Sequence, residues 1–155
     1  GQGENKYDNV RIGINSRLDT LQAVILLNKL EIFDQEIELR NKIADFYSSK
    51  ISDYLNPPFI DSEHKSVWAQ YSLLANSQEE RNSLTAYLNS RGIPTAIYYK
   101  NIFSELDLYK NLTSNNFPVS KKISEQIFSI PMHPYLNNVE LDKIVDTIIE
   151  FYKND

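Results

Sequence analysis

Apolar residues recur at helical spacing along a stretch of the chain that begins at Leu18. Positions three and four residues apart lie on the same face of an α-helix, so this pattern predicts an amphipathic helix. Neither glycine nor proline occurs between Gly13 and Pro57. We therefore expect one helix over residues 18–51, or two helices with a break near Asp34. Unbroken, such a helix would span about 50 Å, which exceeds the core of a small domain, so it would bridge domains or pack on a partner.

Beyond Pro57, shorter patterns of strand and helix type alternate. Runs rich in β-branched and aromatic residues predict strands, whereas helical spacing and capping residues predict helices. The predicted elements are strands at 67–75, 94–99 and 127–132, helices at 79–91, 119–126 and from 138 onward, and a short helical turn at 106–109. Gly92 ends the second helix, and Asn137 or Asn138 caps the last one. The order α–β–α–β–α–β–α indicates an α/β domain with a small sheet that carries its helices on one face.

Composition and charge are those of an ordinary globular domain. Of the 155 residues, 41% are hydrophobic and 24% are charged, which argues against disorder. The formal net charge of −5 excludes a strongly basic nucleic-acid-binding surface. The acidic residues of the long helix are expected to form a solvated face: Glu31, Asp34, Glu36 and Glu38. The longest apolar run, residues 23–27, is too short to cross a membrane.

The absence of cysteine from the chain narrows the chemistry further. It excludes disulfide bonds, thiolate metal sites and a cysteine nucleophile. It is also consistent with a reducing compartment, and we expect a cytoplasmic protein. The two histidines, His64 and His133, lie far apart in the sequence and show no metal-ligand spacing, so no metal site is expected.

Residues 13–17 precede the long helix and form a candidate anion site. The N-terminus of a helix presents free backbone N–H groups and a partial positive charge. Asn15 can donate an amide hydrogen bond, and Arg17 can bind a carboxylate or a phosphate through two parallel hydrogen bonds. An ordinary helix-capping segment with a surface arginine explains the same residues.

His133 and a pair of tyrosines are candidates for contacts with a ligand. Two prolines hold His133 in a stiff segment after a strand, and rigid segments present side chains precisely to a ligand. Tyr98 and Tyr99 end a predicted strand, where neighbouring residues face opposite sides, so one of them can be exposed. A solvent-exposed turn histidine and tyrosines packed on the sheet are the simpler interpretations.

Four segments of the chain carry a resemblance to a known family: GQG…YDNVRIGINSRLDTLQA at 1–23, SVWAQY at 66–71, GIPTAIYY at 92–99 and FSIPMHPYL at 128–136. In this order they resemble the DegT/DnrJ/EryC1/StrS family of pyridoxal-phosphate-dependent sugar aminotransferases. Together they extend through nearly the whole chain, and their joint occurrence is specific to that family. The likeness is closest to the branch that aminates ketosugars on nucleotide carriers for surface polysaccharides.

The resemblance covers only the C-terminal part of a family member, whose chain is more than twice as long. It implies a fold-type-I transferase in which a long connecting helix precedes a small α+β domain with a mainly antiparallel sheet. We accordingly expect the end of the large cofactor domain at 1–17, the connecting helix region at 18–56 and the small domain at 57–155. The family's Schiff-base lysine precedes these regions, so this chain alone is expected to be inactive and without cofactor.

The resemblance implies roles for several residues of this chain. Asn15 is expected to reach the phosphate of pyridoxal phosphate in the other subunit of a homodimer, with Arg17 beside the same pocket. Four residues are expected to line the sugar-nucleotide pocket: His133, Tyr135, Tyr98 and Tyr99. The chain departs from the usual family pattern after residue 99, where KNIF replaces a proline and a later Leu-His pair, which leaves the sugar preference open.

The implied reaction is ping-pong transamination, in which pyridoxal phosphate carries an amino group from glutamate to a nucleotide-linked ketosugar. No catalytic residue is expected in this chain, and neither nucleic acid nor a membrane is expected as a partner. Two alternatives remain open. One is a pyridoxal- or pyridoxamine-phosphate-dependent sugar dehydratase of the same family, in which histidine replaces the upstream lysine. The other is a non-catalytic truncated or interaction domain.

Overall fold

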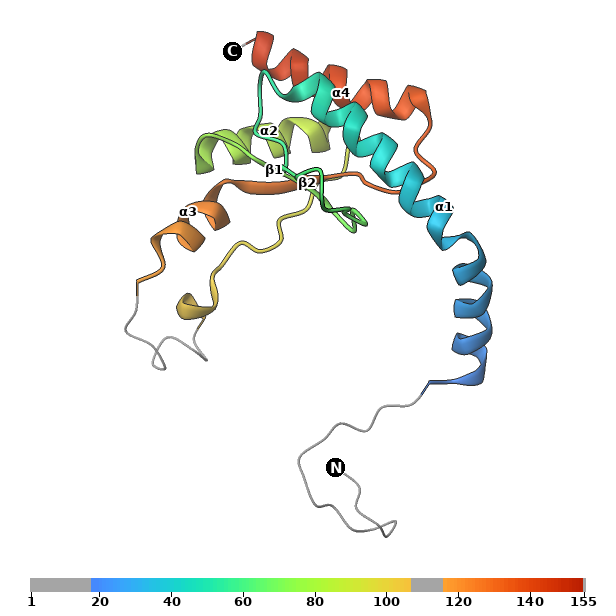
Figure 1. Cartoon of the computed structure of the whole chain (residues 1–155). Helices are drawn as coiled ribbons and strands as arrows, with labels where there is room; N and C mark the ends of the chain where they lie inside the picture. Colours follow the sequence, from blue (N-terminus) through green and yellow to red (C-terminus); the bar gives the residue numbers. More distant parts are fainter. Residues whose placement is uncertain (1–17, 107–115, 155) are drawn as a thin grey trace, which may run out of the picture. The chain divides into compact units, whose positions relative to one another are not determined.

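The computed structural model of the chain describes residues 18–106 and 116–154. Figure 1 shows the elements, which in chain order are α1 (Thr20–Ile51), β1 (Tyr71–Leu74), α2 (Gln78–Ser90), the 3₁₀ helix η1 (Phe103–Glu105), α3 (Pro118–Gln126), β2 (Ile127–Ile130) and α4 (Asn138–Lys153). The chain divides into two compact units, residues 1–34 and 35–155. The expected fold, helices combined with a small antiparallel sheet, is confirmed.

The long helix α1 is unbroken from Thr20 to Ile51, so the alternative of two helices with a break near Asp34 is wrong. Its residues in the first unit expose their apolar side chains, among them Leu21, Leu27 and Leu30. In the second unit the same helix buries a stripe of four residues: Ile43, Ala44, Tyr47 and Ile51. No helix in the described part of the chain is both long and apolar enough to cross a membrane.

The sheet of the second unit consists of two antiparallel strands, with Tyr71 of β1 opposite Ile130 of β2. The strand predicted at 67–75 begins only at Tyr71, because Trp68 has a positive φ of 47° that extended backbone cannot adopt. The strand predicted at 94–99 is wrong. That segment contributes only an isolated bridge between Ala96 and Ser129. Proline at its start has no N–H to donate, so the pairing is not extended in that direction.

The core of the second unit lies between the strand pair and the helices. The largest fully buried apolar side chains are Tyr47, Tyr71, Phe128, Ile51, Leu73, Leu84, Leu88 and Ile148. In Figure 1, α2, α4 and the C-terminal half of α1 lie above the paired strands. The rings of Tyr47 and Tyr71 pack with their centroids 5.2 Å apart, which joins α1 to β1. Burial of each such side chain stabilises the fold by about 1.5–3 kcal/mol.

The connections between elements are fixed by capping residues that the sequence indicates. Asn137, not Asn138, caps α4, and it does so in a capping box with Glu140. The Glu140 N–H donates to Asn137 Oδ1 at 3.0 Å, and the Asn137 N–H donates to Glu140 Oε2 at 2.9 Å. Gly92, at φ +76°, follows the end of α2 in the left-handed conformation that glycine adopts without strain. These caps limit the freedom of the segments that surround the candidate site.

Candidate functional site

Segment 131–135, which follows β2, is tied to one face of α1 by three hydrogen bonds. They run from Tyr47 Oη to Pro131 O (3.0 Å), from Arg40 Nη1 to Met132 O (3.3 Å) and from Tyr135 Oη to a carboxylate oxygen of Glu36. Helix positions 36, 40 and 47 share one face because their spacings of four and seven residues nearly complete whole turns. The segment therefore runs along the helix in the opposite direction. Its backbone is held at Pro131 and Met132, and its far end is held through the Tyr135 side chain.

His133 lies exposed between the two ends of this tied segment, while the following Pro134 is buried. Its ring nitrogen Nδ1 accepts a hydrogen bond from the backbone N–H of Tyr135 at 3.3 Å. A neutral imidazole that accepts through Nδ1 carries its proton on Nε2. Within the described part of the chain, Nε2 has no hydrogen-bond partner. His133 is thus exposed on a tied segment, which agrees with its interpretation as a ligand contact and equally with the simpler interpretation of a solvent-exposed turn histidine.

Tyr135 offers a ring surface rather than a free hydroxyl group. Its side chain is 62% exposed, but its hydroxyl donates to Glu36. This hydrogen bond raises the pKa of the Tyr135 phenol, because the bond and the neighbouring negative charge both favour the neutral form. Glu36 is half-buried and holds Tyr135, so the expectation that Glu36 belongs to a purely solvated face is wrong.

A second tied segment, residues 66–70, approaches the same face of the unit. Asn41 binds it twice, by donating from Nδ2 to Ser66 O at 3.0 Å and accepting from Trp68 Nε1 at 3.1 Å. Arg40 donates to Trp68 O at 2.9 Å. A bulky residue at positive φ costs about 1–3 kcal/mol, so the backbone of Trp68 keeps this conformation only because the surroundings hold it. The two adjacent residues of α1 supply those contacts.

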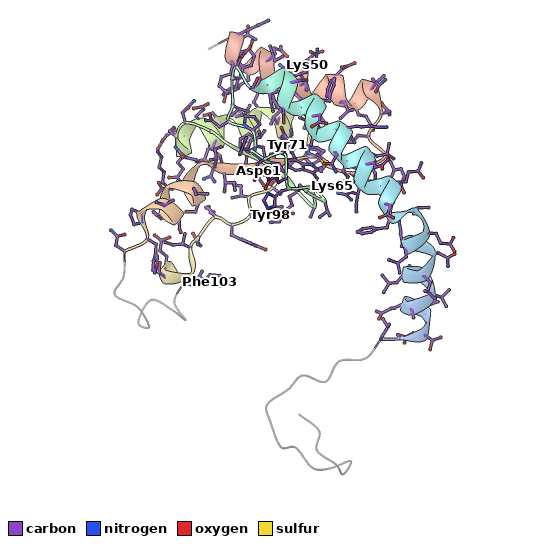
Figure 2. The ribbon with its side chains drawn as sticks, in the orientation of Figure 1. Lys50, Asp61, Lys65, Tyr71, Tyr98 and Phe103 are labelled. Atoms are coloured by element: carbon purple, nitrogen blue, oxygen red, sulfur yellow. The ribbon has the colours of Figure 1, made fainter. Side chains whose placement is uncertain are left out.

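Residues of both tied segments line a hollow of about 240 Å³. Its lining includes Ala69 and Gln70 of one segment and Pro131 and Met132 of the other, together with residues 94–96. Tyr98 also lines it, so the structure brings one of the two predicted tyrosines to the start of the His133 segment. Figure 2 shows Tyr98 beside the strand pair.

Tyr99 lies apart from this hollow and is 76% exposed. Its ring packs edge-on against that of Tyr98, with the centroids 5.8 Å apart. Both tyrosines line a larger open cavity of about 1080 Å³ between residues 97–106 and α3. The described lining of this cavity is mostly apolar, with Lys100 as its one charged residue. The chain between its two walls, 107–115, lies outside the described residues, as does part of the helical turn predicted at 106–109.

The candidate cofactor residues Asn15 and Arg17 also lie outside the described residues, and their predicted roles stay predictions. Among the described residues, no cluster of three or more histidine or acidic side chains has the arrangement of a metal site. The lysines of this part of the chain are exposed, apart from half-buried Lys121, which is paired with Glu105 at 2.7 Å. The described residues thus provide no sheltered lysine to hold pyridoxal phosphate covalently.

The chain is similar to solved aminotransferases and matches a family model. A solved aminotransferase from Brucella abortus, of the DegT DnrJ EryC1 StrS type, superposes with a TM-score of 0.87 and 43% identity, over 96% of this chain and 40% of its own. The model of the DegT/DnrJ/EryC1/StrS aminotransferase family matches residues 1–149. The fold is therefore that of part of a fold-type-I aminotransferase. The chain belongs to the DegT/DnrJ/EryC1/StrS aminotransferase family.

Two characterised relatives act on sugars linked to nucleotides. UDP-2-acetamido-2-deoxy-3-oxo-D-glucuronate aminotransferase from Pseudomonas aeruginosa is 40% identical over 89% of this chain and 38% of its own length. dTDP-3-amino-3,6-dideoxy-alpha-D-galactopyranose transaminase from Aneurinibacillus thermoaerophilus is 31% identical over 92% of this chain and 39% of its own. The chain spans about two fifths of the length of these relatives.

The sequence interpretation missed the residues of α1 that hold the two tied segments. Arg40 and Asn41 look like ordinary surface residues of a helix, and Glu36 looks like one of several acidic neighbours. A signal was present, because Glu36 and Arg40 continue the spacing of the buried residues Ile43 and Tyr47. Polar residues that extend a buried stripe face the same neighbours as the stripe does.

Proposed function

We propose that this chain is the C-terminal portion of a pyridoxal-phosphate-dependent aminotransferase that transfers an amino group from glutamate to a nucleotide-linked ketosugar. Its product would enter surface polysaccharide biosynthesis. The observation that carries the proposal is the exposed His133 on its tied segment, in a chain that belongs to a family of aminotransferases. The names of the two relatives, both nucleotide-sugar aminotransferases, support the substrate class.

In this proposal, the described residues bind and orient the sugar nucleotide. The Nε2–H of His133 donates a hydrogen bond to an oxygen of the ligand, since its Nδ1 is already used as an acceptor. The exposed ring of Tyr135, fixed by Glu36, supplies a flat apolar surface for the sugar or base. Tyr98 faces the hollow at the start of the same segment. Tyr99 contributes through its contact with Tyr98.

The cofactor would be held by residues from two sources. When bound, pyridoxal phosphate supplies the electron sink for amino-group transfer. The lysine that anchors it would belong to the part of the family's length that this chain does not span. Asn15 would donate to the cofactor phosphate of the other subunit of a homodimer, with Arg17 beside it. Asn15→Ala in the complete enzyme should then weaken cofactor retention, and an unchanged cofactor affinity would remove this role.

The experiment is an absorbance spectrum of the complete gene product with pyridoxal phosphate, recorded before and after glutamate is added. Conversion of the aldehyde form of the cofactor to its amine form supports the aminotransferase. Bound cofactor that does not respond to glutamate would favour the sugar dehydratase. A complete gene product that does not retain the cofactor would favour a non-catalytic domain. The trial ketosugar for the second half-reaction is UDP-2-acetamido-2-deoxy-3-oxo-D-glucuronate, after the name of the Pseudomonas aeruginosa relative.

A further inference from the structure

Arg40 is the one residue of α1, among those described, that donates to both tied segments. A single guanidinium nitrogen, Nη1, donates to Trp68 O at 2.9 Å and to Met132 O at 3.3 Å. These carbonyl groups belong to segments that are far apart in the sequence. Both distances are measured from the same atom, so the two backbones are held at a fixed separation.

Both segments contribute to the lining of the 240 Å³ hollow. Residues 69–70, which follow Trp68 directly, line it, and so does Met132. The next residue after Met132 is His133. A change in the relative placement of the segments therefore alters the shape of the hollow and displaces the His133 ring. The planar guanidinium fits this task because its N–H donors have fixed directions, whereas the flexible lysine side chain carries a point charge.

The neighbouring residues of α1 do not duplicate the double contact of Arg40. Tyr47 holds Pro131, and Asn41 holds Ser66 and the Trp68 ring, so each of these residues fixes one segment only. Neither of them joins the segments to each other through a single group. Loss of Arg40 would leave both segments attached to α1 and joined through the Tyr71–Ile130 strand pair, but without the common donor that holds Trp68 and Met132.

We propose that Arg40 is a positioning residue that fixes residues 66–70 and 131–135 relative to each other at the sugar-nucleotide site. The inference rests on the proposed function, in that it assigns the substrate to this site. It predicts a defect confined to the sugar-nucleotide half-reaction, since the described residues carry no sheltered lysine for the cofactor. The glutamate half-reaction should proceed at its normal rate.

The test compares Arg40→Met with the wild type in the complete gene product. Hydrogen exchange should be roughly tenfold faster in segments 66–69 and 132–136, with α2 and α4 unchanged. The KM for the trial ketosugar should rise roughly tenfold, with an unchanged rate of cofactor conversion by glutamate. Arg91→Met is the matched control, because Arg91 donates to Glu150 at 2.9 Å away from both segments. This control should leave both measurements at wild-type values.

Three results would overturn the proposal. The first is unchanged exchange and unchanged KM. The second is a raised KM with unchanged exchange, which would make Arg40 a direct ligand of the substrate. The third is a parallel loss of both half-reactions and of thermal stability, which would make its role a general structural one. If Arg40→Met does not fold, Arg40→Lys is measured instead. A smaller rise is then expected in the hydrogen-exchange rate of the two segments and in the KM for the trial ketosugar. A wild-type protein that does not respond to glutamate would instead refute the proposed function.

Discussion

The hydroxyl group of Tyr135 donates a hydrogen bond to the carboxylate of Glu36, 99 positions earlier in the chain. This contact fixes the far end of the segment that carries His133. The Tyr135 ring is largely exposed, so the hydrogen bond of its hydroxyl group is what holds its orientation. The position of the His133 segment is therefore determined by residues of α1, although the segment itself follows β2.

The first prediction concerns the ionisation of Tyr135. The hydrogen bond to Glu36 raises the pKa of the Tyr135 phenol. The bond is therefore present below the ordinary tyrosine pKa and is lost as the pH rises through the raised pKa of Tyr135. Glu36→Gln removes the negative charge and should lower the pKa of Tyr135 toward its ordinary value. NMR titration of ring-labelled tyrosine, with Tyr135→Phe to assign the signal, measures the change. An unaltered Tyr135 titration would show that the contact does not form in solution.

The second prediction concerns the other end of the segment. Tyr47 is fully buried and donates to Pro131 O at 3.0 Å, so Tyr47→Phe leaves that carbonyl without its donor. Loss of the bond should lower the free energy of unfolding by about 1–2 kcal/mol, since the ring itself is retained. Urea unfolding of the variant and the wild type gives this difference. Stability equal to that of the wild type would mean that the bond contributes nothing.

The third prediction follows from the buried phenols of Tyr47 and Tyr71. Burial raises the pKa of both above the ordinary value of about 10, because the charged phenolate is poorly solvated in the core. Above that pH the unfolded chain loses protons that the native state retains, so the free energy of unfolding falls as pH rises. The decline should be shallower in Tyr47→Phe. Urea midpoints measured through the alkaline range test this, and identical slopes would contradict it.

The fourth prediction compares the contributions of Asn41 and Asn28 to stability. Both Asn41 and Asn28 donate from Nδ2 to the carbonyl four residues earlier, at 2.8 Å. Only Asn41 also binds Ser66 and Trp68, so Asn41→Ala should cost about 1–3 kcal/mol by leaving buried groups unpaired. Asn28→Ala, at an exposed helical position, should change stability by less than about 0.5 kcal/mol. Thermal unfolding of the two variants compares them, and equal costs would refute the assignment.

The helices were predictable because their signals are local. The apolar spacing of α1 and the capping residue Asn137 both act within a few residues, and the structure confirms α1 as one helix and Asn137 as the cap of α4. Residues 94–99 have the composition of a strand, but strand formation depends on a partner with free backbone groups on that edge. Only Ala96 finds one, in Ser129. Composition alone does not reveal this.

The candidate site was predictable only in part, and for a similar reason. His133 stands out because Pro131 and Pro134 stiffen its segment, and the structure shows it exposed. The contributions of Glu36 and Arg40 depend on contacts across 99 and 92 positions of sequence. No local pattern specifies which loop a helical residue will meet. The roles of Asn15 and Arg17 stay predictions, since both precede the described residues.

The central claim, that the His133 segment forms a wall of a sugar-nucleotide site in an aminotransferase, is tested most directly by one measurement. The complete gene product is first converted by glutamate, and amino transfer to the trial ketosugar is then followed in the wild type and in His133→Ala. We predict equal conversion by glutamate and a sugar half-reaction roughly tenfold slower in the variant at low ketosugar concentration, because one hydrogen bond to the ligand is lost. Transfer by His133→Ala at the wild-type rate would contradict the account.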